Sequence, residues 1–259
     1  MNQRERVMYA ELTPMEFRER LRQAPIAYLP LGTLEWHGEH LPLGSDGLQS
    51  QGFFVHLAHE VGGVVLPMLF VGPDSRVVVQ GREFYGMDNH GFEGEAPHHL
   101  DGSAYWVEEE LFRQLLNAIF GQLARAGFKI VVAHGHGPST EEFWRNAPQW
   151  SDKYGLVMFH CWREPVADED YLGIQTDHAA ANETSLMMAL HPELVHMANL
   201  PKDPDKWPVA ISGKDPRTSA SAARGHEAIR VQGDRMAGIL RVALARVRST
   251  PTRALGHEM

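Results

Sequence analysis

Short apolar runs alternate along the chain with longer amphipathic stretches. Apolar runs bounded by glycine or polar turns predict buried strands over 26–32, 64–72, 128–139 and 155–161. Apolar residues at helical spacing predict helices over 14–23, 47–61 and 103–126, a further helix within 176–190, and a closing helix or helix pair over 218–247. This alternation predicts a single α/β domain over residues 1–259, with a mostly parallel sheet covered on both faces.

The ends of several predicted helices carry recognisable capping patterns. Thr13 with Glu16, and Ser139 with Glu142, each match a capping box that would start a helix. Gly127 is placed to end the long helix before it. Asp46 stands just before the helix over 47–61, so an N-cap is one role open to it.

The loop after the first predicted strand reads LGTLEWHGEHLPLGSD and is dense in potential metal ligands. Glu35, His37, His40 and Asp46 supply two carboxylates and two imidazoles from a segment too rich in glycine and proline for a regular helix. Imidazole together with carboxylate suits Zn, Mn or Fe better than Ca or Mg. The alternative is a polar loop whose histidines meet only water or neighbouring carboxylates.

Two further patches carry candidate chemistry. His134 and His136 lie in the glycine-rich turn after the third strand, where α/β enzymes place ligands. Asp177 and His178 precede a helix whose interior acid is Glu183. That acid either favours the helix dipole or, if it points to the core, needs a partner such as a metal ion.

The segment over 73–102 is a long insert without a clear pattern, and such loops are usually functional. It could cover a substrate or form an oligomer contact. Asp88, His90, His98 and His99 could reach a ligand, although solvated loop side chains are the alternative for each.

Composition narrows the partners. The 259 residues carry 24 Lys and Arg against 33 Asp and Glu, a net charge of −9 that favours a small substrate over nucleic acid or an anionic membrane. The lone cysteine, Cys161, excludes an internal disulfide and fits a reducing compartment. No apolar run approaches a membrane span, and the first residues lack the apolar core of a signal peptide. We therefore expect a cytoplasmic protein.

Separated motifs together resemble the creatininase (creatinine amidohydrolase) family. LPLGTLEWHGEHLPLGSD resembles the family's hallmark segment, and GFKIVVAHGHGPS occupies the place of its Asn-Gly-His-Gly-Gly-Asn turn. DHAAANETS is similar to the His-Ala-Gly-x-x-Glu-Thr-Ser motif, and SGKDPRTSASAARG to the late Gly-Asp-Pro segment. The resemblance runs in order from about residue 11 to 230. It implies a three-layer α/β/α sandwich, one or two ions of Zn, Mn or Fe, hydrolytic chemistry and a homo-oligomer, commonly a hexamer.

Matched position by position, the resemblance also implies roles for single residues. The implied metal ligands are Glu35, His37, Asp46, His136 and Glu183, with Asp46 as the bridge if two ions bind. His178 and Asp177 are the candidates for moving protons, and the candidate substrate contacts are His134, Trp162, His90 and His99.

The sequence also departs from the family pattern. Gly137 and Pro138 replace the tyrosine and the ligand glutamate that follow the turn histidine in creatininase itself, and His134 replaces the turn asparagine. These changes argue against creatinine as the substrate. We expect a metal-activated water to attack a carbonyl of a small polar cyclic substrate, with a cyclic amide favoured. The alternatives are carbon–carbon hydrolysis of a cyclic diketo-inositol of the 3-dehydro-scyllo-inosose type, and a non-catalytic metal-containing binding protein.

Overall fold

A parallel sheet forms the centre of the computed structural model, which describes residues 6–90, 97–162 and 172–249. Its strands are β1 (Ile26–Leu31), β2 (Val64–Val65), β5 (Ile130–Gly135) and β6 (Val157–Phe159), in the order β2-β1-β5-β6. All three pairings are parallel, and β1 and β5 pair along their whole length, from Ile26 with Ile130 to Leu31 with Gly135. Their carboxyl ends therefore meet at the same edge.

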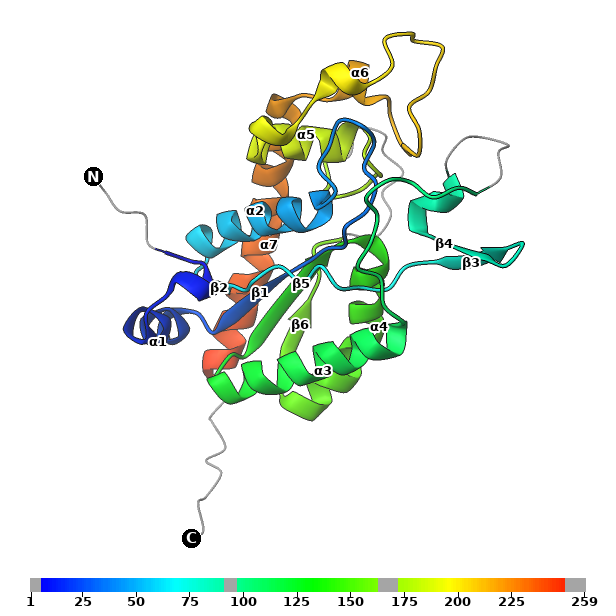
Figure 1. The fold of residues 1–259 in the computed structure, drawn as a ribbon. Helices are drawn as coiled ribbons and strands as arrows, with labels where there is room; N and C mark the ends of the chain where they lie inside the picture. Colours follow the sequence, from blue (N-terminus) through cyan, green and yellow to red (C-terminus); the bar gives the residue numbers. More distant parts are fainter. Residues whose placement is uncertain (1–5, 91–96, 163–171, 250–259) are drawn as a thin grey trace.

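Helices cover both faces of this sheet because its side chains alternate. Ile26 and Tyr28 of β1 point into a core formed with α2 (Ser45–Glu60), α5 (Ala181–Leu190) and α7 (Ala222–Ser249). Ala27, Leu29 and Leu31 point into a second core formed with α3 (Glu109–Ala126) and α4 (Gly137–Tyr154). The two helix layers lie on opposite sides of the strands (Figure 1). The expected three-layer α/β/α fold is confirmed.

The observed helix ends confirm some of the predicted capping patterns and contradict one. Helix α1 (Pro14–Gln23) has the expected capping box: the Glu16 amide donates to Thr13 Oγ1, and the Thr13 amide donates to the Glu16 carboxylate at 2.8 Å. Gly127 ends α3 in a left-handed conformation, as predicted. The capping box at Ser139 is wrong, because α4 already begins at Gly137 and Ser139 is buried in its first turn.

Two elements are shorter than the apolar pattern predicts. Strand β2 holds only two residues of the run over 64–72, since Pro67 has no amide hydrogen for a ladder, although Leu69 still bridges to Leu31. Helix α3 begins at Glu109 rather than near residue 103, because the preceding residues are extended. Ala104 bridges to Leu34 there, and Trp106 bridges to Gly72.

Part of the insert over 73–102 forms a hairpin that projects from the body of the protein (Figure 1). Strands β3 (Arg76–Val79) and β4 (Arg82–Tyr85) pair antiparallel, and the short 3-10 helix η2 (Gly86–His90) follows. The buried Asp88 carboxylate accepts hydrogen bonds from the amides of Tyr85 and Leu100, at 3.2 and 2.8 Å. It thereby joins the hairpin to the returning chain.

The remaining elements are short. They are η1 (Tyr9–Glu11), η3 (Pro192–Leu194), η4 (Met197–Asn199) and α6 (Pro216–Ser219), the last of which makes the closing segment a pair of helices with α7. Within the described ranges, no helix is both long enough and apolar enough to span a membrane.

Candidate functional site

The carboxyl ends of β1 and β5 bring two of the predicted metal-binding segments together. The loop after β1 carries Glu35 and His37, and His136 directly follows β5. At this point Gly135 adopts a φ of +147°, and a Cβ there would lie only 1.7 Å from the Leu31 carbonyl oxygen. Glycine therefore lets the two strand ends approach closely enough for the His136 amide to donate to Leu31, at 3.2 Å.

Asp46 lies between the two imidazoles. It belongs to the first turn of α2 and is not the N-cap, a position that Gly44 holds. Its Oδ2 is 3.2 Å from His136 Nδ1, and its Oδ1 is 3.5 Å from His37 Nε2. Because the side chain is almost fully buried, these contacts take place away from bulk solvent.

Helix α5 contributes a second carboxylate next to His37 Nε2. Glu183 is buried in the first turn of α5, and its Oε2 accepts a hydrogen bond from the Ala179 amide at 2.8 Å. The same oxygen lies 3.6 Å from His37 Nε2. The acid within the apolar helix pattern therefore points inward, toward a potential ligand cluster.

Besides a group of Glu35, His37 and His178, the structure brings together two groups of potential ligands that share Asp46. One consists of Glu35, Asp46 and His136, and the other of His37, Asp46 and Glu183. Within each group the potential ligand atoms all lie within 4.8 Å of one another. Asp46 is common to both, as a carboxylate that bridges two ions must be.

The imidazole nitrogens fit a metal site. His37 Nδ1 is 3.0 Å from the Glu35 carbonyl oxygen, so Nε2 is the nitrogen turned toward Asp46 and Glu183. That Nε2 is buried and has no hydrogen-bond partner among the described residues. A ligating histidine commonly donates its other ring hydrogen to a carbonyl in this way. The mixed nitrogen and oxygen set suits Zn, Mn or Fe.

Without a cation, burial and mutual repulsion shift the pKa values of these groups strongly. Burial raises the pKa of Glu35 to about 7 and that of Glu183 well above its ordinary value. Burial would lower the pKa of His37, but the adjacent Asp46 and Glu183 raise it to about 10. His37 and His136 outweigh burial at Asp46 and hold its pKa well below normal. A divalent cation would relieve this crowding of buried acids.

His178 lies beside this cluster at the edge of the cavity. Its Nε2 is 2.8 Å from the Trp36 carbonyl oxygen, and its ring centre is 4.5 Å from that of His37. Its backbone pairs with Ser212 of the late SGKDP segment. Burial and the neighbouring His37 lower the pKa of His178 to about 3, so the imidazole is neutral.

Asp177 lies just before the start of α5, next to the cluster. Its two carboxylate oxygens accept hydrogen bonds from the amides of Asn182 and Glu183, at 2.7 and 3.1 Å. Burial raises its pKa to about 6. Asp177 therefore fixes the start of α5, and with it Glu183, and it also lines the cavity.

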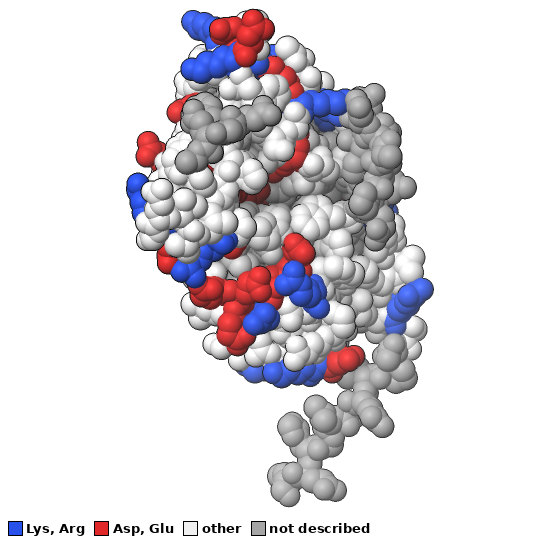
Figure 2. Space-filling view, turned by 90° about the vertical axis from the view of Figure 1, so that its right-hand side faces the viewer, with Lys and Arg blue, Asp and Glu red and all other residues white. Residues whose placement is uncertain are grey.

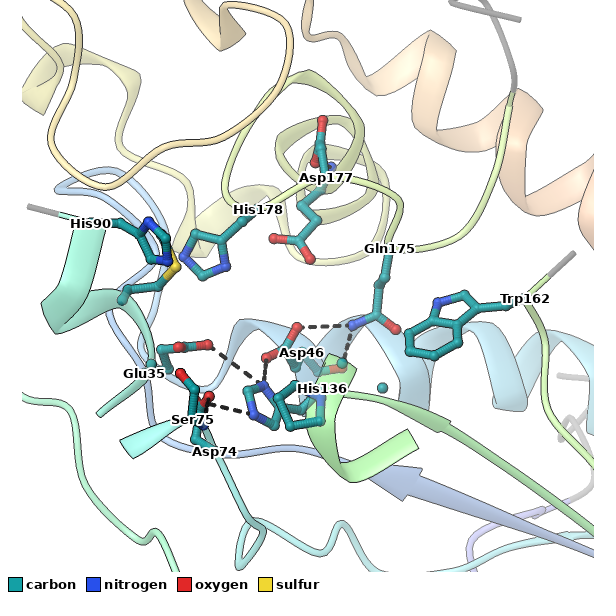
Figure 3. A pocket seen from close by; sticks show the side chains of 16 residues that line it. Glu35, Asp46, Asp74, Ser75, His90, His136, Trp162, Gln175, Asp177 and His178 are labelled. Carbon is teal, nitrogen blue, oxygen red and sulfur yellow. Dashed lines mark hydrogen bonds and ion pairs between the residues drawn. The ribbon is translucent and has the colours of Figure 1, made fainter. Parts of the chain in front are cut away.

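A cavity of about 280 Å³ opens above the clustered side chains. Its walls include Ser75, Met87 and His90 of the insert, and Trp162 and Gln175 on the opposite side (Figure 3). Acidic side chains are visible inside a recess on the face shown in Figure 2. A cavity of this size accepts a small molecule.

Two expected substrate contacts lie elsewhere. His134 is completely buried behind the cavity, edge-on to the Trp162 ring at 5.4 Å, and does not line the cavity. His99 lies outside the cavity, with Nε2 at 2.8 Å from the Glu83 carbonyl oxygen. His40 is also apart from the cluster and contacts Thr184 Oγ1 at 2.9 Å. Trp162 and His90 do line the cavity.

Two residues of the site were not predicted from the sequence. Gln175 Nε2 donates to Asp46, and Asp74 Oδ2 lies 3.4 Å from His136 Nε2. Asp74 lies two residues after the predicted strand over 64–72, and this position near a strand end is the signal that could have identified it. Gln175 carries no comparable signal beyond its closeness to Asp177 and His178.

Comparisons with known proteins agree with this geometry. The family model for creatininase, described as creatinine amidohydrolase, matches residues 10–240. Creatinine amidohydrolase from Pseudomonas putida is 27% identical over 209 residues. The match covers 74% of this chain and 74% of that protein. The 3-dehydro-scyllo-inosose hydrolase from Thermotoga maritima is 24% identical over 200 residues. The match covers 73% of this chain and 58% of that protein.

Solved structures show the same fold. A creatininase structure described as its Mn form aligns with a TM-score of 0.70 at 22% identity, covering 92% of this chain and 98% of that one. A variant described as Zn-Zn type aligns with a TM-score of 0.69, with the same identity and coverage. Since the family model covers most of the sequence and the clustered acids and histidines stand at its motifs, the chain belongs to the creatininase family.

Proposed function

We propose that this protein is a metal-dependent hydrolase whose site holds two transition-metal ions, zinc or manganese, with iron as a further option. The observation that carries the proposal is the pair of ligand groups that share Asp46 at the bottom of the cavity. One ion would be held by Glu35, Asp46 and His136, and the other by His37, Asp46 and Glu183. The manganese and zinc forms of the related creatininases support this choice of metals.

The remaining side chains suggest how the reaction is assisted. Bound ions supply Lewis-acid polarisation of a carbonyl and activate water near neutral pH. His178 Nε2 is engaged by the Trp36 carbonyl, so Nδ1 is the nitrogen that takes up a proton and passes it to the leaving group. Its lowered pKa keeps the imidazole neutral, with Nδ1 unprotonated. Trp162 offers an apolar face against which a ring can lie.

For the substrate we favour a small polar cyclic amide other than creatinine. Similarity to the Pseudomonas putida enzyme supports hydrolysis of a cyclic amide. At the start of α4, however, Gly137 faces open space and Pro138 carries no polar group. That part of the wall therefore offers no side-chain hydrogen bond to a guanidine-like ring.

Hydrolysis of a carbon–carbon bond in a cyclic diketo-inositol is the second candidate. Similarity to the Thermotoga maritima hydrolase supports it, and so does the polar character of the walls. Ser75 and Gln175 face the cavity together with several carboxylates, and such groups accept or donate hydrogen bonds to the hydroxyls of a polyol.

The test begins with the metal content per chain, measured by plasma mass spectrometry on protein purified without added metal or a metal-binding tag. One or two transition-metal ions per chain would support the metal site, and essentially none after dialysis against zinc and manganese would reject it. The loaded protein is then assayed with cyclic amides, lactones and keto-inositols. Bound metal without turnover of any of these would favour the non-catalytic binding protein. Light scattering of the same preparation checks the predicted homo-oligomer.

A further inference from the structure

Asp74 is a buried carboxylate of the insert to which the proposed reaction assigns no role. Its side chain is only 5% exposed. Oδ1 accepts a hydrogen bond from the Ser75 amide at 2.6 Å, whereas Oδ2 has no hydrogen-bond partner among the described residues. Oδ2 lies 3.4 Å from His136 Nε2, which is likewise buried without such a partner. Two unpartnered polar atoms thus face each other.

The two ring nitrogens of His136 face different carboxylates. Its Nδ1 lies 3.2 Å from Asp46 Oδ2 and 3.5 Å from Glu35 Oε2 (Figure 3). A histidine that ligates a metal through one nitrogen commonly donates the hydrogen of the other to a carboxylate, which fixes the ring and strengthens the ligand. His136 matches this pattern, with Asp46 and Glu35 at Nδ1 and Asp74 at Nε2.

The backbone of the insert holds Asp74 in place. The Gly86 amide donates to the Ser75 carbonyl at 2.9 Å, which draws the end of the hairpin over Asp74. A Cβ on Gly86 would lie 2.4 Å from Asp74 Oδ2 and 2.6 Å from Glu35 Oε1. No side chain fits at this position. Glycine therefore allows the insert to contact both carboxylates directly.

We propose that Asp74 is a positioning residue for His136. It accepts the hydrogen on Nε2, which leaves Nδ1 to ligate the ion that Glu35 and Asp46 also hold. The insert then supports the metal centre from outside, in addition to forming a wall of the cavity. This inference rests on the proposed metal site, and its test separates the two.

The experiment measures zinc affinity by competition with a chromophoric chelator in the full-length protein. Asp74→Ala should weaken one of the two zinc sites by about 10–100-fold. Asp74→Asn should weaken it less, because its amide oxygen can still accept the Nε2 hydrogen. Gly86→Ala should also weaken zinc binding, but its Cβ would displace both Asp74 and the candidate ligand Glu35, so the two Asp74 variants carry the test.

Asp88→Asn is the matched control. Asp88 is also a buried carboxylate of the insert, but its contacts are the amides of Tyr85 and Leu100. This variant should lose stability and keep the zinc affinity of the natural chain. Unchanged affinity in Asp74→Ala would overturn the proposal, and so would an equal loss in Asp88→Asn, because general packing of the insert would then explain both.

If the natural chain binds no zinc, the proposed function fails and the contact is tested on its own. Long-range ¹H–¹⁵N correlation spectra of the metal-free protein report the state of each ring nitrogen of His136. Asp74→Ala should shift the Nε2 resonance of His136 more than the Nδ1 resonance. An unchanged Nε2 resonance would show that Asp74 does not position the ring.

Discussion

Gln175 donates from one side-chain nitrogen to both the carbonyl oxygen and Oδ1 of Asp46, each at 3.1 Å. Its own Oε1 accepts a hydrogen bond from the Ser50 hydroxyl at 2.8 Å, so the amide is held at both ends. The backbone of Gln175 has a φ of +53°, an angle that residues other than glycine seldom adopt. The carboxylate shared by both ligand groups is therefore oriented by a neighbour that would touch no metal ion.

Replacing that neighbour should loosen the site without removing a ligand. Gln175→Ala should weaken metal binding by about tenfold, because Asp46 loses the donor that orients it. Chelator competition measures the affinity, and urea unfolding measures the change in stability. Gln49→Ala is the control, since Gln49 is also buried and bonds to Ser45 Oγ at 2.9 Å on the same helix. Equal affinity losses in both variants would assign the effect to packing.

Removing single carboxylates should distinguish a shared ligand from an unshared one. Asp46→Ala should lose both ions, because it belongs to both groups, whereas Glu183→Ala should lose only the ion held with His37. Metal content per chain, measured after identical loading, gives the stoichiometry, and circular dichroism confirms the fold. Full metal occupancy in Asp46→Ala would contradict the bridging role.

His178 should affect the reaction rate rather than metal content. His178→Ala should lower the turnover number by about 10²–10⁴-fold, the usual effect of a general acid or base. Metal content should stay the same. His99→Ala is the matched control because His99 lies outside the cavity on the insert. An unchanged turnover number in His178→Ala would remove this residue from the mechanism.

The buried thiol of Cys161 predicts a dependence of stability on alkaline pH that is independent of the metal site. Burial raises the pKa of Cys161 to about 12, from an ordinary value of 9.0. Between these values the unfolded chain loses the thiol proton while the folded chain keeps it, so the contribution to stability falls as pH rises. Urea unfolding in chelator at pH 8 to 11 should show a steeper loss for the natural chain than for Cys161→Ala. Parallel curves would refute the prediction.

Local pattern predicted the fold better than it predicted individual contacts. The apolar runs identified β1 and β5 because strands buried on both faces leave a continuous signal, and glycine after each strand marked where ligands gather. Ser139 and Glu142 matched a capping box, but the chain turns helical earlier, at Gly137, and Glu142 instead forms ion pairs with Arg113 and Arg145. A capping pattern does not encode where the preceding strand stops.

The potential metal ligands could be predicted from the sequence, but the residues that orient them could not. Glu35 and Asp46 stood out because they share one loop with two histidines, and Glu183 because an acid that points to a core needs a partner. Asp177 belongs to the same motif as Glu183, and its carboxylate holds the start of α5. Gln175 and Asp74 act on side chains that lie far away in sequence, and only the pairing of the strands brings these residues together.

The close approach of β1 and β5 at Gly135 also bears on how the protein matures. The candidate ligands span residues 35 to 183 and come from the ends of β1 and β5 and from α2 and α5, so an unfolded chain offers no preformed site. Metal would therefore load after the sheet has formed and would favour the folded state by mass action. Refolding without metal should yield a native-like sheet with less protection from hydrogen exchange at the starts of α2 and α5, and protection there should return when zinc is added.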